Sequence, residues 1–134
     1  FLKPNYTRLY EYIKSRGVLV QHHCDGVLKG LEEDMLDIHV DMWQGAIPQS
    51  DINGFKEKTS GKILVIGGID QTAYEKEDFD EDRVRAECRR AIDEYAPGGS
   101  FLPSLPSVMP VINETFPIVI DECNKYGAEW IKKQ

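Results

Sequence analysis

The sequence predicts an α/β fold in which strand–helix units repeat around a parallel sheet. Residues 63–66 form an uninterrupted apolar run, mostly β-branched, between Gly61 and Gly67. Such a run is typical of a parallel strand that is covered on both faces. Patterns of strand and helix alternate along the whole chain, and repeated strand–helix units imply parallel strands joined by right-handed crossovers.

The first half of the chain contains two helical and two extended patterns. Apolar groups at helical spacing predict a helix at 5–16, which Gly17 ends. The hydrophobic run at 18–24 predicts a strand. Residues 27–35 carry apolar groups on one side and charged groups on the other, so we expect a second helix there. A second strand is expected at 38–43.

The second half continues the alternation. A short helix is expected at 52–59, and the apolar run at 63–66 is the third strand. The most regular helical pattern covers 80–95 and stops at a Pro-Gly-Gly sequence. A fourth strand is expected at 100–102, followed by a proline-rich loop and a last helix at 116–132.

Four such units are compatible with a small open sheet or with half of an eight-stranded TIM barrel, whose usual length is about 250 residues. The chain has 134 residues, lacks an initiator Met and begins in a helical pattern. We therefore interpret it as a piece of a longer protein. The expected architecture is one domain over residues 1–134, formed as half of a (β/α)8 barrel.

The amino-acid composition limits which classes of binding partner are expected for this chain. The chain has 23 acidic and 16 basic residues, a net charge of −7, and no basic stripe. Nucleic acid and membrane surfaces are therefore not expected partners, and no apolar run is long enough to span a bilayer. Three cysteines, without secretory marks, favour the cytoplasm. A half barrel would expose its interior and two strand edges, so we expect self-association.

A possible metal site lies at the end of the first strand, in the run His22-His23-Cys24-Asp25-Gly26. Side chains alternate across a strand, so His22 and Cys24 should share one face and His23 the other. Imidazole and thiolate are zinc ligands, and this pair would supply half of a site. The alternative is a histidine that bonds a backbone carbonyl at a strand end. Asp25 would support the metal ligands or cap the next helix.

Other candidates follow the second and third strands. Trp43 and Gln44 would provide an aromatic wall and an amide for a substrate, although Trp43 suits a core equally well. Gly68 would allow a ligand to approach the backbone closely, with Asp70 facing the site. The alternative is a sharp turn in which Asp70 bonds its own backbone. The glycines fit no nucleotide-binding motif.

Four short motifs resemble the carboxy-terminal half of the uroporphyrinogen decarboxylase superfamily. They are the His22–Gly26 run, Asp41-Met42-Trp43-Gln44-Gly45, Gly67-Gly68-Ile69-Asp70 and Ala96-Pro97-Gly98-Gly99. The superfamily consists of TIM barrels and includes the decarboxylase and zinc-dependent methyltransferases that act on methylcobalamin and coenzyme M. The resemblance implies that these are the last four strands of a barrel and that their carboxyl ends line its active site.

Within that superfamily the chain is more similar to the methyltransferases, which bind zinc through a His-x-Cys pair and a further cysteine after the last strand. His22 and Cys24 match the pair. The further cysteine is missing, and Ser104 is the nearest polar group, although a serine hydroxyl is a poor zinc ligand.

The resemblance implies methyl transfer between a small-molecule donor or thiol and a corrinoid on a partner protein. Asp25 and Asp70 would assist catalysis, and Trp43, Gln44, Gly68 and Ser104 would contact the substrate. The alternatives are metal-free uroporphyrinogen decarboxylation, in porphyrin biosynthesis, and a non-catalytic barrel that only binds a ligand.

Overall fold

Four parallel strands form one sheet in which the spatial order, β1-β2-β3-β4, is also the order along the chain. The computed structural model describes residues 1–73, 79–105 and 114–134. The α/β class and the parallel strand–helix repeat are thereby confirmed. The strands are β1 (Gln21–His23), β2 (Met42–Ala46), β3 (Leu64–Gly68) and β4 (Phe101–Ser104). The helices of the described residues are α1 (Lys3–Lys14), α2 (Glu32–Asp37), α3 (Ile52–Lys58), α4 (Glu81–Tyr95) and α5 (Thr115–Ile131), with 3-10 turns η1 (Pro48–Ser50) and η2 (Gln71–Ala73).

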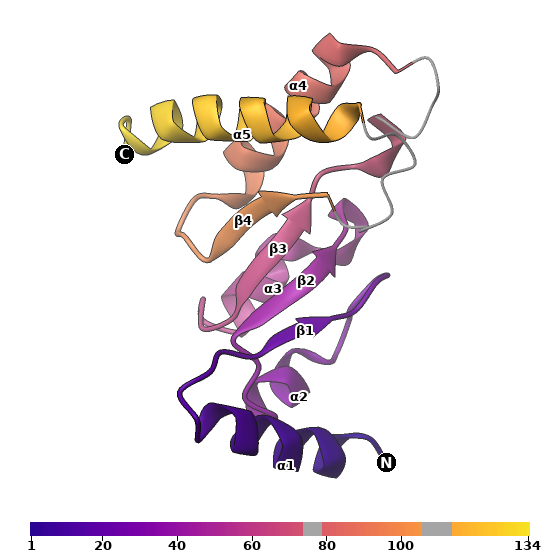
Figure 1. Cartoon of the computed structure of the whole chain (residues 1–134), viewed down its shortest axis with the longest axis vertical. Helices are drawn as coiled ribbons and strands as arrows, with labels where there is room; N and C mark the ends of the chain where they lie inside the picture. The colour runs from indigo at the N-terminus through magenta and orange to yellow at the C-terminus, as the bar shows by residue number, and fades with distance from the viewer. Residues whose placement is uncertain (74–78, 106–113) are drawn as a thin grey trace.

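One face of the sheet packs against the helices. Figure 1 shows α3 behind the strands, α2 and α1 beyond β1, and α4 with α5 beyond β4. The strand register aligns His22, Trp43, Val65 and Phe101 in one row across the sheet. Trp43 is fully buried in this row and its ring lies 4.7 Å from that of Phe55 on α3. This row therefore belongs to the face that the helices cover.

The opposite face carries no helix of the described residues (Figure 1). Because side chains alternate along a strand, the residues between those of the covered row point to this open face. They form two rows. The row toward the amino ends is Gln21–Met42–Leu64, and the row toward the carboxyl ends is His23–Gln44–Ile66–Leu102. Apolar groups thus occupy most of the open face, with polar ones at the carboxyl ends of β1 and β2.

Three expected elements begin later or end sooner in the structure than their sequence pattern suggested. The strand expected at 18–24 is regular only at 21–23, and the helix expected at 27–35 begins at Glu32. Gly26 and Gly30 have positive φ angles of 91° and 81°, which a helix does not contain. The strand expected at 38–43 begins at Met42, because His39 has a φ of 64° and belongs to a turn.

The second half of the chain agrees more closely with expectation. The helices expected at 52–59, 80–95 and 116–132, and the strands expected at 63–66 and 100–102, are all present within two residues at each end. The proline-rich loop after β4 lies outside the described residues over 106–113. Among the described residues, no helix combines the length and the apolar character needed to cross a bilayer.

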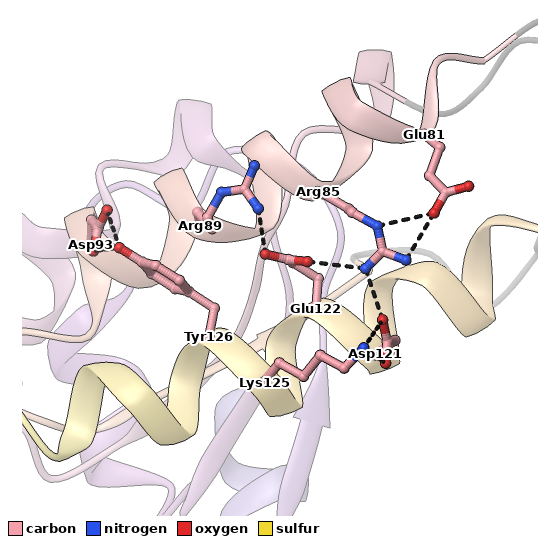
Figure 2. Close-up of polar contacts among 8 residues, drawn as sticks. All are labelled: Glu81, Arg85, Arg89, Asp93, Asp121, Glu122, Lys125 and Tyr126. Carbon is pink, nitrogen blue, oxygen red and sulfur yellow. Dashed lines mark hydrogen bonds and ion pairs between the residues drawn. The ribbon is translucent and has the colours of Figure 1, made fainter.

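Helices α4 and α5 are held together by charged side chains (Figure 2). Arg85 on α4 donates to Glu122 on α5 at 3.0 Å, and Arg89 donates to the other carboxylate oxygen of Glu122. One turn further along, the hydroxyl of Tyr126 donates to Asp93 at 2.9 Å. Contacts along two helical turns hold α5 against α4, and so determine where α5 lies beside β4.

The close approach of β2 and β3 depends on Gly67. A Cβ at this position would lie 2.2 Å from the carbonyl oxygen of Ala46, and φ is +145°. Gly67→Ala should therefore lower the free energy of unfolding by about 2–5 kcal/mol, through steric overlap and backbone strain together. Urea denaturation followed by circular dichroism measures the loss.

Gly98→Ala is the matched control, because φ is +77° there but no atom lies within 4 Å of the added Cβ. It should lose only about 1–2 kcal/mol, the cost of the backbone conformation. Equal losses in the two variants would contradict the packing account.

Candidate functional site at the carboxyl ends of the strands

Three polar side chains meet on the open face where β1 and β2 end. His23 Nδ1 is hydrogen-bonded to Gln44 Oε1, and His23 Nε2 lies 3.3 Å from Asp25 Oδ2. The side chains of His23 and Asp25 are 47% and 68% exposed, so small molecules can reach the cluster. We refer to His23, Gln44 and Asp25 as the polar cluster.

The strand register and one glycine bring this cluster together. His23 and Gln44 are direct partners across β1 and β2. Next to Gln44, β2 contains a register irregularity at Gly45, whose φ is +105°. A Cβ on Gly45 would lie 2.8 Å from the carbonyl oxygen of Cys24 and 2.9 Å from Asp25 Oδ1. Glycine at this position therefore lets the segment after β1 lie close to β2, which holds Asp25 beside His23.

His22 lies on the other face, against α1. The hydroxyl of Tyr10 is 2.7 Å from His22 Nδ1, and the ring of Tyr6 meets the imidazole edge-on at 5.4 Å. Burial lowers the pKa of His22, and the neighbouring charge of His23 adds to this effect. The expected orientation of the two histidines is thus wrong. They alternate as anticipated, but His22 faces the helices with Trp43, and His23 faces the open side.

Cys24 is held mainly through its backbone. Its N–H donates to the carbonyl of Gln44 at 3.0 Å, and its own carbonyl accepts the indole N–H of Trp43 at 3.0 Å. Its thiol is 3.7 Å from the carbonyl oxygen of Asp25. Over the described residues, no three His, Cys, Asp or Glu side chains gather closely enough to hold a metal ion. Zinc stays a prediction here, since His22 and Cys24 would supply only half of a site.

Trp43 forms no substrate wall, because its side chain is fully buried on the helix-covered face. The expectation that it lines a pocket beside Gln44 is wrong for a simple geometric reason. Neighbouring residues of a strand point to opposite faces, so only one of the two can reach the open side. Gln44 is therefore the residue that reaches the open face, and Trp43 packs in the core.

Gly68 and Asp70 form a sharp turn after β3, which is the structural alternative to a ligand-binding role. A Cβ on Gly68 would lie 2.8 Å from the ring of Phe101, so the close neighbour is the protein's own side chain. The carboxylate of Asp70 accepts the backbone N–H of Thr72 at 2.9 Å, as in a turn. Both residues shape the backbone at the carboxyl end of β3.

Two residues that sequence reasoning missed stabilise the same turn. Glu87 accepts the backbone N–H of Asp70 at 2.8 Å, and Arg90 donates to the carbonyl of Gly68 at 2.8 Å. Arg90 also pairs with Glu87 at 2.6 Å, and this hydrogen bond raises the pKa of the guanidinium. Glu87 and Arg90 are three residues apart on α4. This spacing could have indicated an ion pair, but not that the pair also bonds the backbone after β3.

Ser104 lies apart from the polar cluster, at the end of β4. Its hydroxyl donates to the carbonyl of Leu105 at 3.2 Å. It contributes to the wall of an apolar cavity of about 590 Å³ between β4 and α5. The structure thus brings together Asp25 and Gln44 from the expected site residues, adds His23, and leaves the other candidates elsewhere.

Comparison of the chain with models of protein families, with curated proteins and with solved structures yields no match. The geometry above and the motif resemblance are therefore the observations from which a function can be proposed.

The burial of His22 predicts how stability changes with pH. Its folded pKa is lowered, so the folded protein takes up the proton less readily than the unfolded chain. The free energy of unfolding should fall as the pH drops below about 6.5 and should level off under the folded pKa. Urea denaturation midpoints between about pH 7.5 and 5.5 measure this effect. His22→Gln should remove most of the slope, whereas His23→Gln should reduce it only in part, because burial is the larger cause of the lowered pKa. An unchanged slope in His22→Gln would contradict the assignment.

Proposed function

We propose that the chain supplies the carboxy-terminal half of a (β/α)8-barrel enzyme similar to the uroporphyrinogen decarboxylase superfamily. The proposed reaction is methyl transfer, in the cytoplasm, between a small-molecule donor or thiol and a corrinoid on a partner protein. Four parallel strands in chain order, with helices on one face, support the half-barrel architecture. The superfamily and the reaction rest on the motifs described above.

The polar cluster is the observation that carries the proposal. Barrel enzymes bind substrates at the carboxyl ends of their strands, in loops and residues that face the barrel axis. His23, Gln44 and Asp25 lie at those ends, on the face that a closed barrel would turn inward. The proposal therefore assigns the active-site imidazole to His23 in place of His22.

The contacts of His23 suggest its chemical role. The amide oxygen of Gln44 faces Nδ1, and the proposal uses the tautomer that donates from Nδ1 and has its lone pair on Nε2. Nε2 can accept the proton of a substrate thiol, and Asp25 then pairs with the imidazolium. The thiolate keeps the electron pair of the broken S–H bond and is the nucleophilic form. A corrinoid, when bound, would supply or accept the methyl group.

No step of this proposal passes through zinc, since the described residues gather no three-donor set. The second candidate is the metal-free decarboxylation of uroporphyrinogen. In that reaction the polar cluster would bind a substrate carboxylate through the protonated imidazole. The non-catalytic, ligand-binding barrel is the third possibility.

The proposal predicts that His23→Ala slows methyl transfer about 100-fold, a usual loss on removal of a general base. The full chain is incubated with methylcobalamin and a small thiol, and loss of the methyl group is followed by the absorption spectrum of the corrinoid. Gln21→Ala is the matched control, because Gln21 lies on the same strand and face, one row further from the carboxyl ends. It should stay within about twofold of the unmodified chain, since the hydrogen bonds and ion pairs of His23 and Asp25 do not involve Gln21.

Further arms of the assay separate the candidates. An equal rate in His23→Ala would contradict the role of His23. A rate that requires added zinc would place the metal donors outside the described residues. Consumption of uroporphyrinogen without methyl transfer would establish the second candidate, and absence of both activities would leave a ligand-binding barrel.

A further inference from the structure

Two cysteines face each other between α4 and α5, outside the polar cluster. Cys88 lies on α4 and is completely buried in the hydrophobic core, and Cys123 lies on α5 and packs against that core. Both thiols are free. A hydrogen bond joins the two side chains. A contacting pair of free thiols can be oxidised to a disulfide without any other part of the protein.

The packing of the two helices explains why these thiols meet. The polar contacts in Figure 2 join residues of α4 to residues of α5 in the same order along both helices, so the helices run parallel. On the apolar side of this contact, a Cβ on Gly127 would lie 3.9 Å from Ile92 Cδ1. Cys88 precedes Ile92 by four residues, and Cys123 precedes Gly127 by four. One helical turn before a close contact, the next pair on the same side is therefore Cys88 and Cys123.

The hydrogen bond makes the two thiols chemically different. It lowers the pKa of Cys123, which accepts from Cys88, although burial and the charge of Glu122 oppose this effect. The same hydrogen bond, together with burial, raises the pKa of Cys88. Cys123 is therefore the thiol that more readily becomes a thiolate, and Cys88 is the one that keeps its proton. The thiolate is the form that reacts with oxidants.

Cys123 is also the more accessible of the two sulfurs. Its side chain is half-buried and contributes to the wall of the cavity between β4 and α5, whereas Cys88 has no exposed surface. A small, uncharged oxidant therefore meets Cys123 first. Low pKa, access and a neighbouring second thiol are the features that redox-sensitive cysteines share.

We propose that Cys123 and Cys88 form a hydroperoxide-sensitive site, in which Cys123 is oxidised first and Cys88 then closes a disulfide between α5 and α4. The Cys123 thiolate attacks one oxygen of the hydroperoxide. An S–O bond forms, the O–O bond breaks, and the departing oxygen takes up a proton. The Cys88 sulfur then gives up its proton and attacks the sulfur of Cys123, so that an S–S bond forms and the S–O bond breaks with loss of water. The two sulfurs lose two electrons in total, which the hydroperoxide gains.

The first step favours the second. Once Cys123 is a sulfenic acid, its sulfur carries no negative charge, and the main cause that raises the pKa of Cys88 is gone. The Cys88 thiolate that the second step needs then forms more readily. In a reducing cytoplasm such a disulfide is transient. It would tie α5 covalently to α4, next to the ion pairs of Glu122. The site lies within one chain and does not rest on the proposed methyl transfer.

Peptide mapping of the full chain tests the proposal. The chain is treated with a small excess of hydrogen peroxide, the remaining thiols are alkylated, and the digest is analysed by mass spectrometry. The chain should lose the mass of two hydrogen atoms, a peptide pair should be joined through Cys88 and Cys123, and dithiothreitol should reverse the change. A treated chain without this bond, whichever thiol has reacted, would overturn the proposal.

Two controls show whether the fold selects the pair. Cys24→Ser should form the same disulfide at the same rate, because Cys24 takes no part in it. In urea, the unmodified chain should lose the preference for this pair and also form bonds to Cys24. The same preference in the unfolded chain would contradict the role of helix packing.

Two substitutions of Cys88 test its hydrogen bond. Cys88→Ser keeps a donor, Cys88→Ala removes it, and neither variant can form the disulfide. Peroxide-dependent labelling of Cys123 by dimedone, which traps sulfenic acid, should be about tenfold slower in Cys88→Ala than in Cys88→Ser, as for a thiol whose pKa rises by about one unit. Circular dichroism checks that both variants fold. Equal labelling rates would overturn the assignment of Cys88 as the donor, and the mapping of the unmodified chain depends on neither variant.

Discussion

The register between β1 and β2 is the constraint on which the rest of the structure depends. It places His22 beside Trp43, and the indole of Trp43 is fully buried against α3. A slip of one residue would move every side chain of β1 to the other face, because strand side chains alternate. The register therefore decides which of two adjacent imidazoles packs under α1 and which faces the open side. The chemical interpretation of the whole chain follows from that choice.

Several independent contacts oppose such a slip. The backbone of Cys24 bonds to β2, its carbonyl accepts the indole N–H of Trp43, and Tyr10 bonds His22 from α1. Gly45 allows the following segment to lie close enough for Asp25 to reach His23. The same contacts that complete the core thus assemble the polar cluster. His23 belongs to β1 and Gln44 to β2, so the contact between these two side chains is positioned by the sheet itself.

Sequence patterns predicted the fold class better than they predicted the site. Apolar periodicity predicted α4 and β3 almost to the residue, because burial on these elements is strongly one-sided or complete. It misplaced α2, since the positive φ angles of Gly26 and Gly30 are not evident from periodicity. Alternation correctly separated His22 from His23, but residues 18–20 are all apolar and could not indicate which face is buried. The tyrosines of α1, four residues apart, were the available signal, and they become informative only once α1 is known to cover β1.

The central claim is that His22 faces α1 and His23 faces the open side of the sheet. Nuclear Overhauser contacts from the two imidazoles in the full chain test it most directly. The account predicts that the ring protons of His22 show contacts with the rings of Tyr6 and Tyr10, and that those of His23 show contacts with the side chain of Gln44. Contacts of His23 with the two tyrosines, and of His22 with Gln44, would contradict it.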